Sequence, residues 1–393
     1  MIKTKLDPSI VAATLTTCLN KGVAPIALHE PSFRGNEWLF VKDCLDTGWV
    51  SSVGKYVDKF EQELAAFTGV KRAVAVVNGT ASLQIAFEVA GVCPGDEVLV
   101  PDLTFVATTS AVKHCGANPH FVDISVTSLG VDPQKLREGL EKIGRQTPEG
   151  LFNLQTGKKI SALVVVHTFG HPAEMDELAE ICSEFKLTLV EDAAESIGSY
   201  YKGQHTGNVG LVSTLSFNGN KTITTGGGGA ILTNDARIGE IAKHITTTAK
   251  IPHRWKFAHD RVGYNFRMPN INAALGCAQL ESLPLLLSKK RDLAARYQIA
   301  FEEIPGVKFL AEPKYGKSNY WLNTLILDED QAQLRDPILE LTNNQGIQTR
   351  PAWEPMHTLP MYADCQRMDV SNSISMASRI INIPSSPCLT PDV

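Results

Sequence analysis

The sequence predicts an α/β fold in which helices cover both faces of a mostly parallel sheet. Between about residues 72 and 233, short apolar runs alternate with amphipathic helical patterns, as strands alternate with helices in such folds. Polar or glycine-containing segments directly follow several of these runs, where open α/β sheets place their ligand sites. Because 393 residues exceed the size of one comfortable core, we expect two domains in one compact molecule.

Seven apolar runs are expected to form the strands of this sheet. The first is 72–77, and an amphipathic helix is expected to follow it from Ala81. The other strands are expected at 97–100, 121–122, 163–166, 187–190, 211–217 and 230–233. The segment 145–159 is largely polar and is expected to be a loop.

The second half of the chain changes pattern. From Asn270 the pattern is helical for about thirty residues, with an interruption at Pro284. The run Lys289-Lys290-Arg291 within it is expected to be a solvated face. From about residue 306, short strands and helices alternate, which suits a small α/β domain. We therefore expect three parts: a helical segment over 1–30, a large domain over 31–265, and linking helices with a small C-terminal domain over 266–393.

Composition excludes several classes of protein. The hydrophobic content of 43% and charged content of 20% are those of a soluble globular protein. The net charge of −5 argues against nucleic acid as a partner. Eight cysteines without a C-x-x-C pair favour reduced thiols in a cytoplasm over a disulfide framework or a zinc site, and no metal is expected. No signal peptide is visible, and no apolar run approaches the ~20 residues that a membrane helix needs.

Lys221 is the most informative single residue. It stands between two expected strands, directly before Thr222-Ile223-Thr224-Thr225 and the glycine run 226–229. Tight glycine turns let backbone close around a flat ligand. A buried lysine loses its charge readily and becomes a nucleophile toward aldehydes, as is needed to hold pyridoxal phosphate as a Schiff base. Most lysines are solvated surface charges, so this interpretation requires further parts of a cofactor site.

Three other segments supply candidate parts. Asp192 follows a buried strand and could keep a pyridine nitrogen protonated, although an acidic pair there could simply cap a helix. Backbone N–H groups after Asn78, in the turn Asn78-Gly79-Thr80, together with the Thr80 hydroxyl form an anion site, or only an ordinary turn and cap. Phe105 follows the strand 97–100 and could stack on a ring, although a phenylalanine there is more often part of the core.

Together these motifs resemble a known family. The segments Asn78-Gly79-Thr80, Thr104-Phe105, Glu191-Asp192-Ala193-Ala194, Ser216-Phe217 with Lys221, and 262–268 occur in the order seen in the DegT/DnrJ/StrS family of pyridoxal-phosphate-dependent sugar aminotransferases. The match runs from about residue 25 to 384. The resemblance implies the aspartate-aminotransferase-like fold type I, with a three-layer, mostly parallel sheet and a smaller C-terminal α/β domain.

The resemblance also assigns cofactor residues. It implies that Lys221 forms the Schiff base, that Asp192 pairs with the ring nitrogen and that Phe105 stacks on the ring. The phosphate would be held by Gly79, Thr80, Ala81 and Ser216. Asn265 would reach the phosphate of the neighbouring subunit, so that a homodimer shares its active sites. Glu195 stands where the family often has glutamine, near the cofactor hydroxyl, and an ionised carboxylate cannot donate to a phenolate oxygen.

Substrate contacts are less well defined by the sequence. The family counterpart of 49–54 touches the sugar nucleotide, which points to Trp49, Ser51 and Gly54, although a simple turn is the alternative. His171 could line the cofactor face or be a structural histidine. Arg350 and His357 are candidates for the diphosphate or base, because a guanidinium suits phosphate oxygens.

Within the family, the segments 167–172 and 253–255 are similar to the LegC-type branch. That branch aminates the 4-keto group of a UDP-linked 4-keto-6-deoxy-N-acetylhexosamine. The resemblance therefore implies transfer of an amino group from glutamate to such a sugar, giving a UDP-4-amino sugar for surface glycans of the bacillosamine or legionaminic acid type. The alternatives are amination at C3, a non-catalytic regulator that kept the fold, and a related sugar dehydratase, whose members carry histidine where this chain has Lys221.

Overall fold

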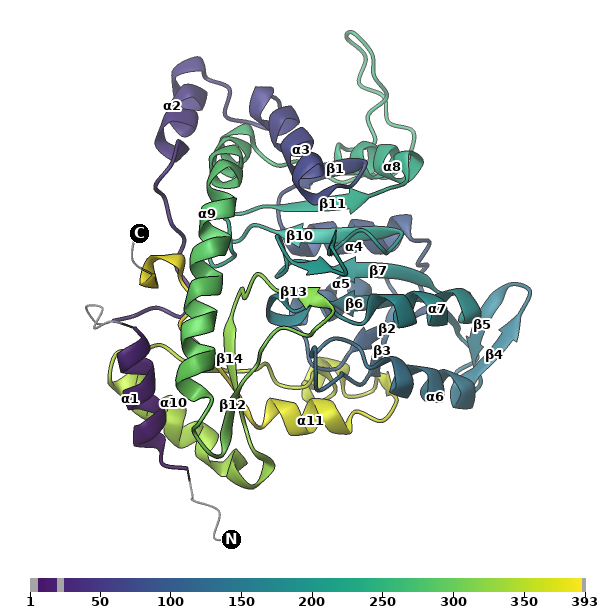
Figure 1. Cartoon of the computed structure of the whole chain (residues 1–393). Helices are drawn as coiled ribbons and strands as arrows, with labels where there is room; N and C mark the ends of the chain where they lie inside the picture. Colours follow the sequence, from purple (N-terminus) through teal and green to yellow (C-terminus); the bar gives the residue numbers. More distant parts are fainter. Residues whose placement is uncertain (1–5, 20–24, 391–393) are drawn as a thin grey trace.

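The computed structural model describes residues 6–19 and 25–390. Its centre is a large sheet with helices on both faces (Figure 1). Eight strands form the main path of this sheet: β1 (Arg72–Val76), β2 (Glu97–Pro101), β3 (Asn118–Val122), β6 (Lys159–Val166), β7 (Thr188–Asp192), β10 (Val212–Ser216), β11 (Gly229–Thr233) and β16 (Gln366–Arg367). The seven strands predicted from the sequence are all present, with ends that differ by a few residues.

The spatial order of the strands is β1-β11-β10-β7-β6-β2-β3-β16. Only β11 runs antiparallel to its neighbours along this path; the other pairs are parallel. The predicted mostly parallel sheet is thereby confirmed. Because parallel strands deliver their carboxyl ends to the same edge, the segments after β2, β6, β7 and β10 meet there.

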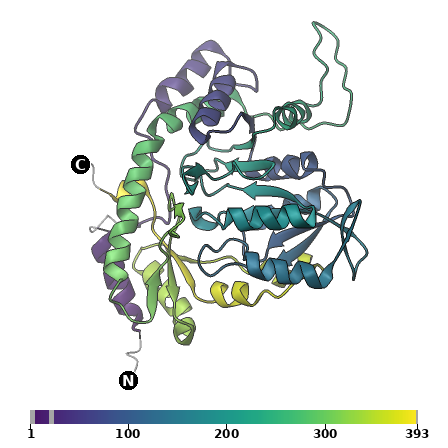
Figure 2. The same cartoon turned by 45° about the vertical axis from the view of Figure 1, so that its right-hand side comes forward.

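Helices form an outer layer on each face of the sheet (Figure 2). On one face lie α4 (Gly79–Val89), α5 (Val106–His114) and α8 (Ala236–Thr246); on the other lie α6 (Pro133–Ile143) and α7 (Met175–Phe185). Val98 and Val100 of β2 pack toward the first layer, and Leu99 between them packs toward the second. Burial on both faces explains why the strands read as continuous apolar runs.

Over β1, β11 and β10, the face opposite α4 and α8 is covered by α3 (Lys55–Thr68) and by the first half of α9 (Asn270–Phe301), and α2 (Glu37–Thr47) packs on α9. The predicted interruption at Pro284 is wrong, because α9 continues through the proline. Burial of Leu280, Leu283 and Leu286 around it offsets the lost backbone hydrogen bond, which costs about 3 kcal/mol in an unsupported helix.

The C-terminal part contains a smaller antiparallel sheet in the order β12-β14-β17-β15. Its strands are β12 (Val307–Phe309), β14 (Asn323–Leu327), β15 (Arg350–Pro351) and β17 (Ile380–Ile383), with α10 (Arg335–Asn344) and α11 (Ser371–Ala377) beside them. The N-terminal helix α1 (Pro8–Cys18) packs on α9 and α10 and shares their apolar core. The three-part division of the chain stays a prediction, and residues 1–5 and 20–24 of its first part lie outside the described residues.

Two further expectations from the sequence are wrong. The segment 145–159 is not simply a loop, because β4 (Gly144–Thr147) and β5 (Gly150–Asn153) form a hairpin there that pairs with β6. Lys289 and Lys290 do not lie on a solvated face, since both are buried. Within 6–19 and 25–390, no helix has the length and apolar character required to cross a membrane.

Candidate active site

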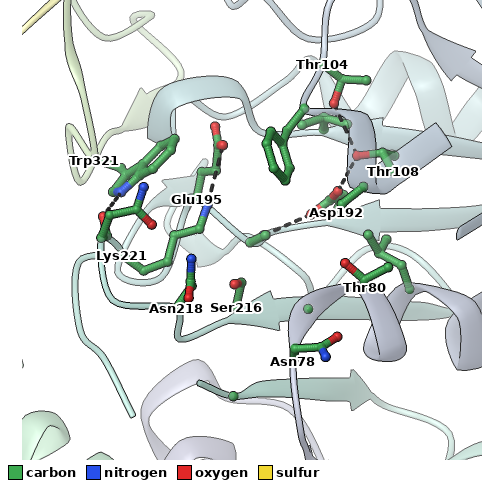
Figure 3. Close-up of a pocket in the computed structure, with 18 of the residues that line it drawn as sticks. Asn78, Thr80, Thr104, Thr108, Asp192, Glu195, Ser216, Asn218, Lys221 and Trp321 are labelled. Atoms are coloured by element: carbon green, nitrogen blue, oxygen red, sulfur yellow. Dashed lines mark hydrogen bonds and ion pairs between the residues drawn. The ribbon is translucent and has the colours of Figure 1, made fainter. Parts of the chain in front are cut away.

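A cavity of about 370 Å³ opens at the carboxyl edge of the large sheet (Figure 3). Segments that lie far apart in the chain line it, from the turn after β1 to the C-terminal domain. The lining residues that bear polar or aromatic groups are Asn78, Thr80, Thr104, Phe105, Thr108, Asp192, Glu195, Ser216, Asn218, Asn220, Lys221, Trp321 and Trp353. The sheet edge predicted to hold a ligand therefore holds a cavity of the size of a small cofactor with part of a substrate.

Lys221 projects into this cavity from the segment after β10. The Lys221 N–H donates to the Asn218 carbonyl, and the turn that this hydrogen bond closes orients the side chain. Only 9% of the residue is exposed. Its Nζ lies 3.5 Å from the Glu195 carboxylate and 3.9 Å from the centre of the Trp321 ring. The amine is therefore held between one carboxylate and one aromatic face.

Asp192 ends β7 and faces the same cavity (Figure 3). Its carboxylate accepts hydrogen bonds from the Thr108 hydroxyl at 2.7 Å and from the Ala194 N–H at 3.1 Å. The Thr104 hydroxyl lies 3.2 Å from that of Thr108 and extends this chain of contacts. Burial raises the pKa of Asp192, although these hydrogen bonds oppose the rise. A cationic ring nitrogen opposite it would favour the ionised form.

The N-terminus of α4 closes the other end of the cavity. Asn78 caps it, its side-chain oxygen accepting from the Ala81 N–H at 2.8 Å, so that Gly79 and Thr80 line the cavity while Ala81 does not. Backbone approaches closely here: a Cβ on Gly79 would lie 2.9 Å from the Ser216 Cβ, and one on Gly229 would lie 2.5 Å from the Asn78 carbonyl oxygen. Glycine at both positions brings β10 and β11 against the helix start.

Phe105 lies at the mouth of the cavity and is 51% exposed, so the alternative of a core phenylalanine is wrong. Its ring meets Trp353 at a centroid distance of 6.3 Å, and Trp353 in turn packs on Phe169 at 5.0 Å. The side chain is thus free on one side to cover a flat ligand.

Glu195 replaces the glutamine that the family often has. One carboxylate oxygen accepts from the Phe169 N–H at 2.8 Å, and the other faces Lys221. Burial raises the pKa of Glu195 to about 7, with the Lys221 charge acting in the opposite direction. Near neutrality this side chain therefore has a protonated form that donates a hydrogen bond.

These residues fit pyridoxal phosphate. The cavity brings together a buried amine for an aldehyde, a carboxylate for a ring nitrogen and a helix start for a phosphate. The close approach of Ser216 to the helix start, which would bring a phosphate within reach of both, requires that Gly79 lack a Cβ.

Comparison with known proteins gives the same result. The family model described as DegT/DnrJ/EryC1/StrS aminotransferase family matches residues 32–393. The GDP-perosamine synthase of Vibrio cholerae is 38% identical over 370 residues, which are 93% of this chain and 95% of that protein. The GDP-perosamine synthase of Escherichia coli O157:H7 is 36% identical over 368 residues, 93% of this chain and 94% of that protein. Among solved structures, the aminotransferase TlmJ from Streptoalloteichus hindustanus has a TM-score of 0.82 and 26% identity, covering 92% of this chain and 93% of that one.

The chain belongs to the DegT/DnrJ/EryC1/StrS aminotransferase family. It is an enzyme of fold type I, and its cofactor is pyridoxal phosphate. The fold predicted from the sequence resemblance is confirmed.

Several residues that the family pattern nominates lie outside this cavity. Asn265 is exposed, and its side-chain oxygen accepts from the Arg267 guanidinium at 2.9 and 3.0 Å. Trp49 and Ser51 present their carbonyls to Asn270, and Gly54 packs so closely on Asn270 that a Cβ would overlap it. With Ser52 and Val53, Gly54 instead lines a second cavity of about 500 Å³.

The other three nominated residues, His171, Arg350 and His357, also do not line the cavity. His171 is fully buried against Tyr320, away from the cavity, and burial lowers its pKa to about 4. Arg350 is exposed on β15. His357 gives its backbone N–H and its Nδ1 to the buried Asp102 at 2.9 and 2.7 Å. The substrate-binding roles of these three residues stay predictions.

Sequence reasoning missed five residues that line the cavity: Thr108, Asn218, Asn220, Trp321 and Trp353. Thr108 carried a signal, because it follows Thr104 by four residues at a helix start and so shares its face. Trp321 and Trp353 come from the C-terminal domain, at least 100 residues beyond Lys221, and no local pattern connects them to it.

Proposed function

We propose that this aminotransferase moves an amino group from glutamate to the C4 ketone of a nucleotide-linked 4-keto-6-deoxy sugar. The observation that carries the proposal is the convergence of Lys221, Asp192 and the α4 N-terminus on one cavity. Relatives named GDP-perosamine synthase, which the chain matches over nearly its whole length, support a nucleotide-linked substrate.

The cofactor, when bound, supplies the electron sink for the bonds made and broken at carbon. Lys221, once free of it, removes the proton from the α-carbon of the amino donor and later returns a proton to C4 of the sugar. Asp192 holds the ring nitrogen protonated, and Thr108 and Ala194 fix its carboxylate. Gly79, Thr80 and Ser216 bind the phosphate. Because the two substrates use one site in turn, the kinetics are ping-pong.

The sequence resemblance and the relatives point to different carrier nucleotides. The resemblance to the LegC-type branch implies UDP, whereas the two relatives are named for a GDP-linked product. Identity of 38% over 93% of the chain favours GDP as the first carrier to test, with UDP second. Amination at C3 remains the alternative for the position of the ketone. A non-catalytic role is disfavoured because Lys221 and Asp192 are both present and both face the cavity.

We further propose a homodimer with shared active sites. Asn265 is exposed and does not line the cavity of its own chain. The segment 250–262 projects from the molecule as a hairpin (Figure 1). Trp255, Phe257 and Val262 on this hairpin are exposed apolar side chains. A two-fold pair would bury them and present Asn265 to the partner's cofactor phosphate.

The test uses GDP-, UDP- and dTDP-linked 4-keto-6-deoxy sugars with glutamate, and it measures 2-oxoglutarate release and the mass of the sugar product. We expect 2-oxoglutarate and amino sugar in equal amounts with one carrier preferred, and NMR should place nitrogen at C4. Nitrogen at C3 would establish the alternative, and no 2-oxoglutarate with any of these sugars would contradict the proposal.

A further inference from the structure

Lys290 is a fully buried amine on α9 that the proposed reaction does not use. Its Nζ donates to the carbonyls of Ser385 at 2.6 Å and Trp321 at 3.2 Å, and it lies 3.0 Å from His29 Nε2. An ammonium has three N–H donors, and these three acceptors use all of them. Within the described residues no carboxylate pairs with it. A buried charge without a counter-ion is costly, and burial lowers the pKa of Lys290 to about 7.

His29 lies between this amine and the active site. When Lys290 is protonated, His29 Nε2 is its acceptor and the proton of the neutral ring is on Nδ1, which is buried without a hydrogen-bond partner among the described residues. Burial and the positive charges of Lys290 and Lys221 hold the pKa of His29 well below its usual value. The imidazole therefore stays neutral and serves Lys290 as an acceptor.

Trp321 connects Lys290 to Lys221 directly. Its carbonyl accepts from Lys290, and its indole N–H donates to the Asn220 carbonyl at 2.7 Å, one residue before Lys221 (Figure 3). Its ring face lies against the Lys221 amine. One side chain thus fixes both the backbone that carries the catalytic amine and the amine itself.

We propose that Lys290 is a positioning residue for Lys221, acting through Trp321 and His29. It anchors the Trp321 backbone between α9 and the C-terminal domain, and the indole then holds the Asn220–Lys221 corner. Without the anchor the corner relaxes, and Lys221 meets the cofactor aldehyde in a productive orientation less often. The inference rests on the proposed role of Lys221.

The test measures how fast the visible absorbance band rises when pyridoxal phosphate is added to cofactor-free protein. We expect Lys290→Met to slow this rise about tenfold, since small misplacements of a reacting group cost one to two orders of magnitude. The matched control is Arg296→Met on the same helix. Arg296 also donates to backbone carbonyls, those of Cys18 and Leu389, but contacts neither Trp321 nor His29. It should lower the melting temperature and leave the rate unchanged.

A double-variant cycle separates positioning from general loosening. Trp321→Phe keeps a ring beside Lys221 but loses the N–H donor to Asn220. If Lys290 acts through this bond, the absorbance band of the double variant should rise almost as fast as that of Trp321→Phe alone. If the two residues act independently, the two fold-reductions in rate should multiply.

A second pair of variants covers the case in which Lys290→Met does not fold. His29→Gln keeps an acceptor for Lys290 and should keep the rate, whereas His29→Leu removes it and should slow the rise. Any of three results would overturn the positioning role. The first is a Lys290→Met rate equal to that of wild type, the second is multiplicative effects on the rate in the double-variant cycle, and the third is equal rates for the two His29 variants. A band that rises normally in Lys221→Ala would instead show that the assignment of Lys221 is wrong.

Discussion

At the scale of single residues, the site depends on charged groups that are buried in the walls of the cavity. Lys221 and Glu195 face each other at 3.5 Å, and Asp192 is buried with two hydrogen-bond donors on its carboxylate. In such surroundings each protonation state is set by a few neighbours, so single substitutions have large and specific effects.

Asp192→Asn should keep the fold and lower kcat by several orders of magnitude, because an amide does not hold the ring nitrogen protonated. Steady-state kinetics measure kcat, and circular dichroism checks that the variant is folded. The matched control is Thr108→Val, which removes the 2.7 Å hydrogen bond but leaves the carboxylate, and should cost far less. A fall of less than about tenfold in Asp192→Asn, about 1.4 kcal/mol of barrier, would mean that the aspartate is merely structural.

Glu195 should make cofactor affinity depend on pH. Its pKa is raised to about 7. If Glu195 lies near the cofactor hydroxyl oxygen, as the family pattern implies, its neutral form below that pH would donate to this oxygen and its carboxylate above that pH would repel it. The dissociation constant of pyridoxal phosphate should therefore rise between pH 6 and 8.5 in the wild type. Glu195→Gln, which stays neutral, should lack this step. An identical pH dependence in both proteins would exclude a titrating Glu195.

Membership of the candidate site was predictable for residues that lie next to a recognisable strand or turn in the sequence. It was not predictable for residues that only the tertiary fold brings to the cavity. Asp192 ends an apolar run and Lys221 follows another by four residues, so local sequence nominated both as candidates. The family resemblance then assigned their roles. Trp321 reaches the site only because the C-terminal domain packs on the large one. Lys290 was taken for a solvated charge because its acceptors, the carbonyls of Trp321 and Ser385, are invisible in a sequence.

At the scale of elements, the junction of α4 with β11 positions the helix start that is proposed to bind the phosphate. Gly229→Ala would place a Cβ 2.5 to 2.8 Å from the backbone of Asn78 and Gly79. The helix start must then move, which should lower the free energy of unfolding by about 1–3 kcal/mol and weaken phosphate binding. Urea unfolding and titration with pyridoxal phosphate measure the two effects. Gly219→Ala is the control, since its Cβ meets nothing; equal losses in both variants would contradict the account.

The strands were predictable because both faces of the sheet are buried, which makes each strand a continuous apolar run. The hairpin β4–β5 was missed for the opposite reason. Its strands lie at the edge of the sheet, and β4 exposes Arg145 and Gln146 to solvent, so its sequence is polar like that of a loop. The unbroken helix α9 was missed because only packing explains why Pro284 is tolerated.

At the scale of the whole molecule, the proposed dimer predicts complementation. Lys221→Ala and Asn265→Ala should each be impaired as homodimers. After subunit exchange, each mixed dimer has one site with both a wild-type lysine and a wild-type asparagine, so activity should partly return. Exchange is verified by mass spectrometry of differently tagged chains. No recovery despite exchange, or a monomeric mass for fully active enzyme, would show that each site is completed within one chain.

The most direct test of the central claim is the first half-reaction alone. Protein loaded with pyridoxal phosphate is mixed with glutamate in the absence of any sugar, and 2-oxoglutarate is counted against active sites. We predict one equivalent per site in the wild type and none in Lys221→Ala, because the proposed mechanism assigns removal of the α-proton to Lys221. Release that requires the sugar, or a full equivalent from Lys221→Ala, would contradict the account.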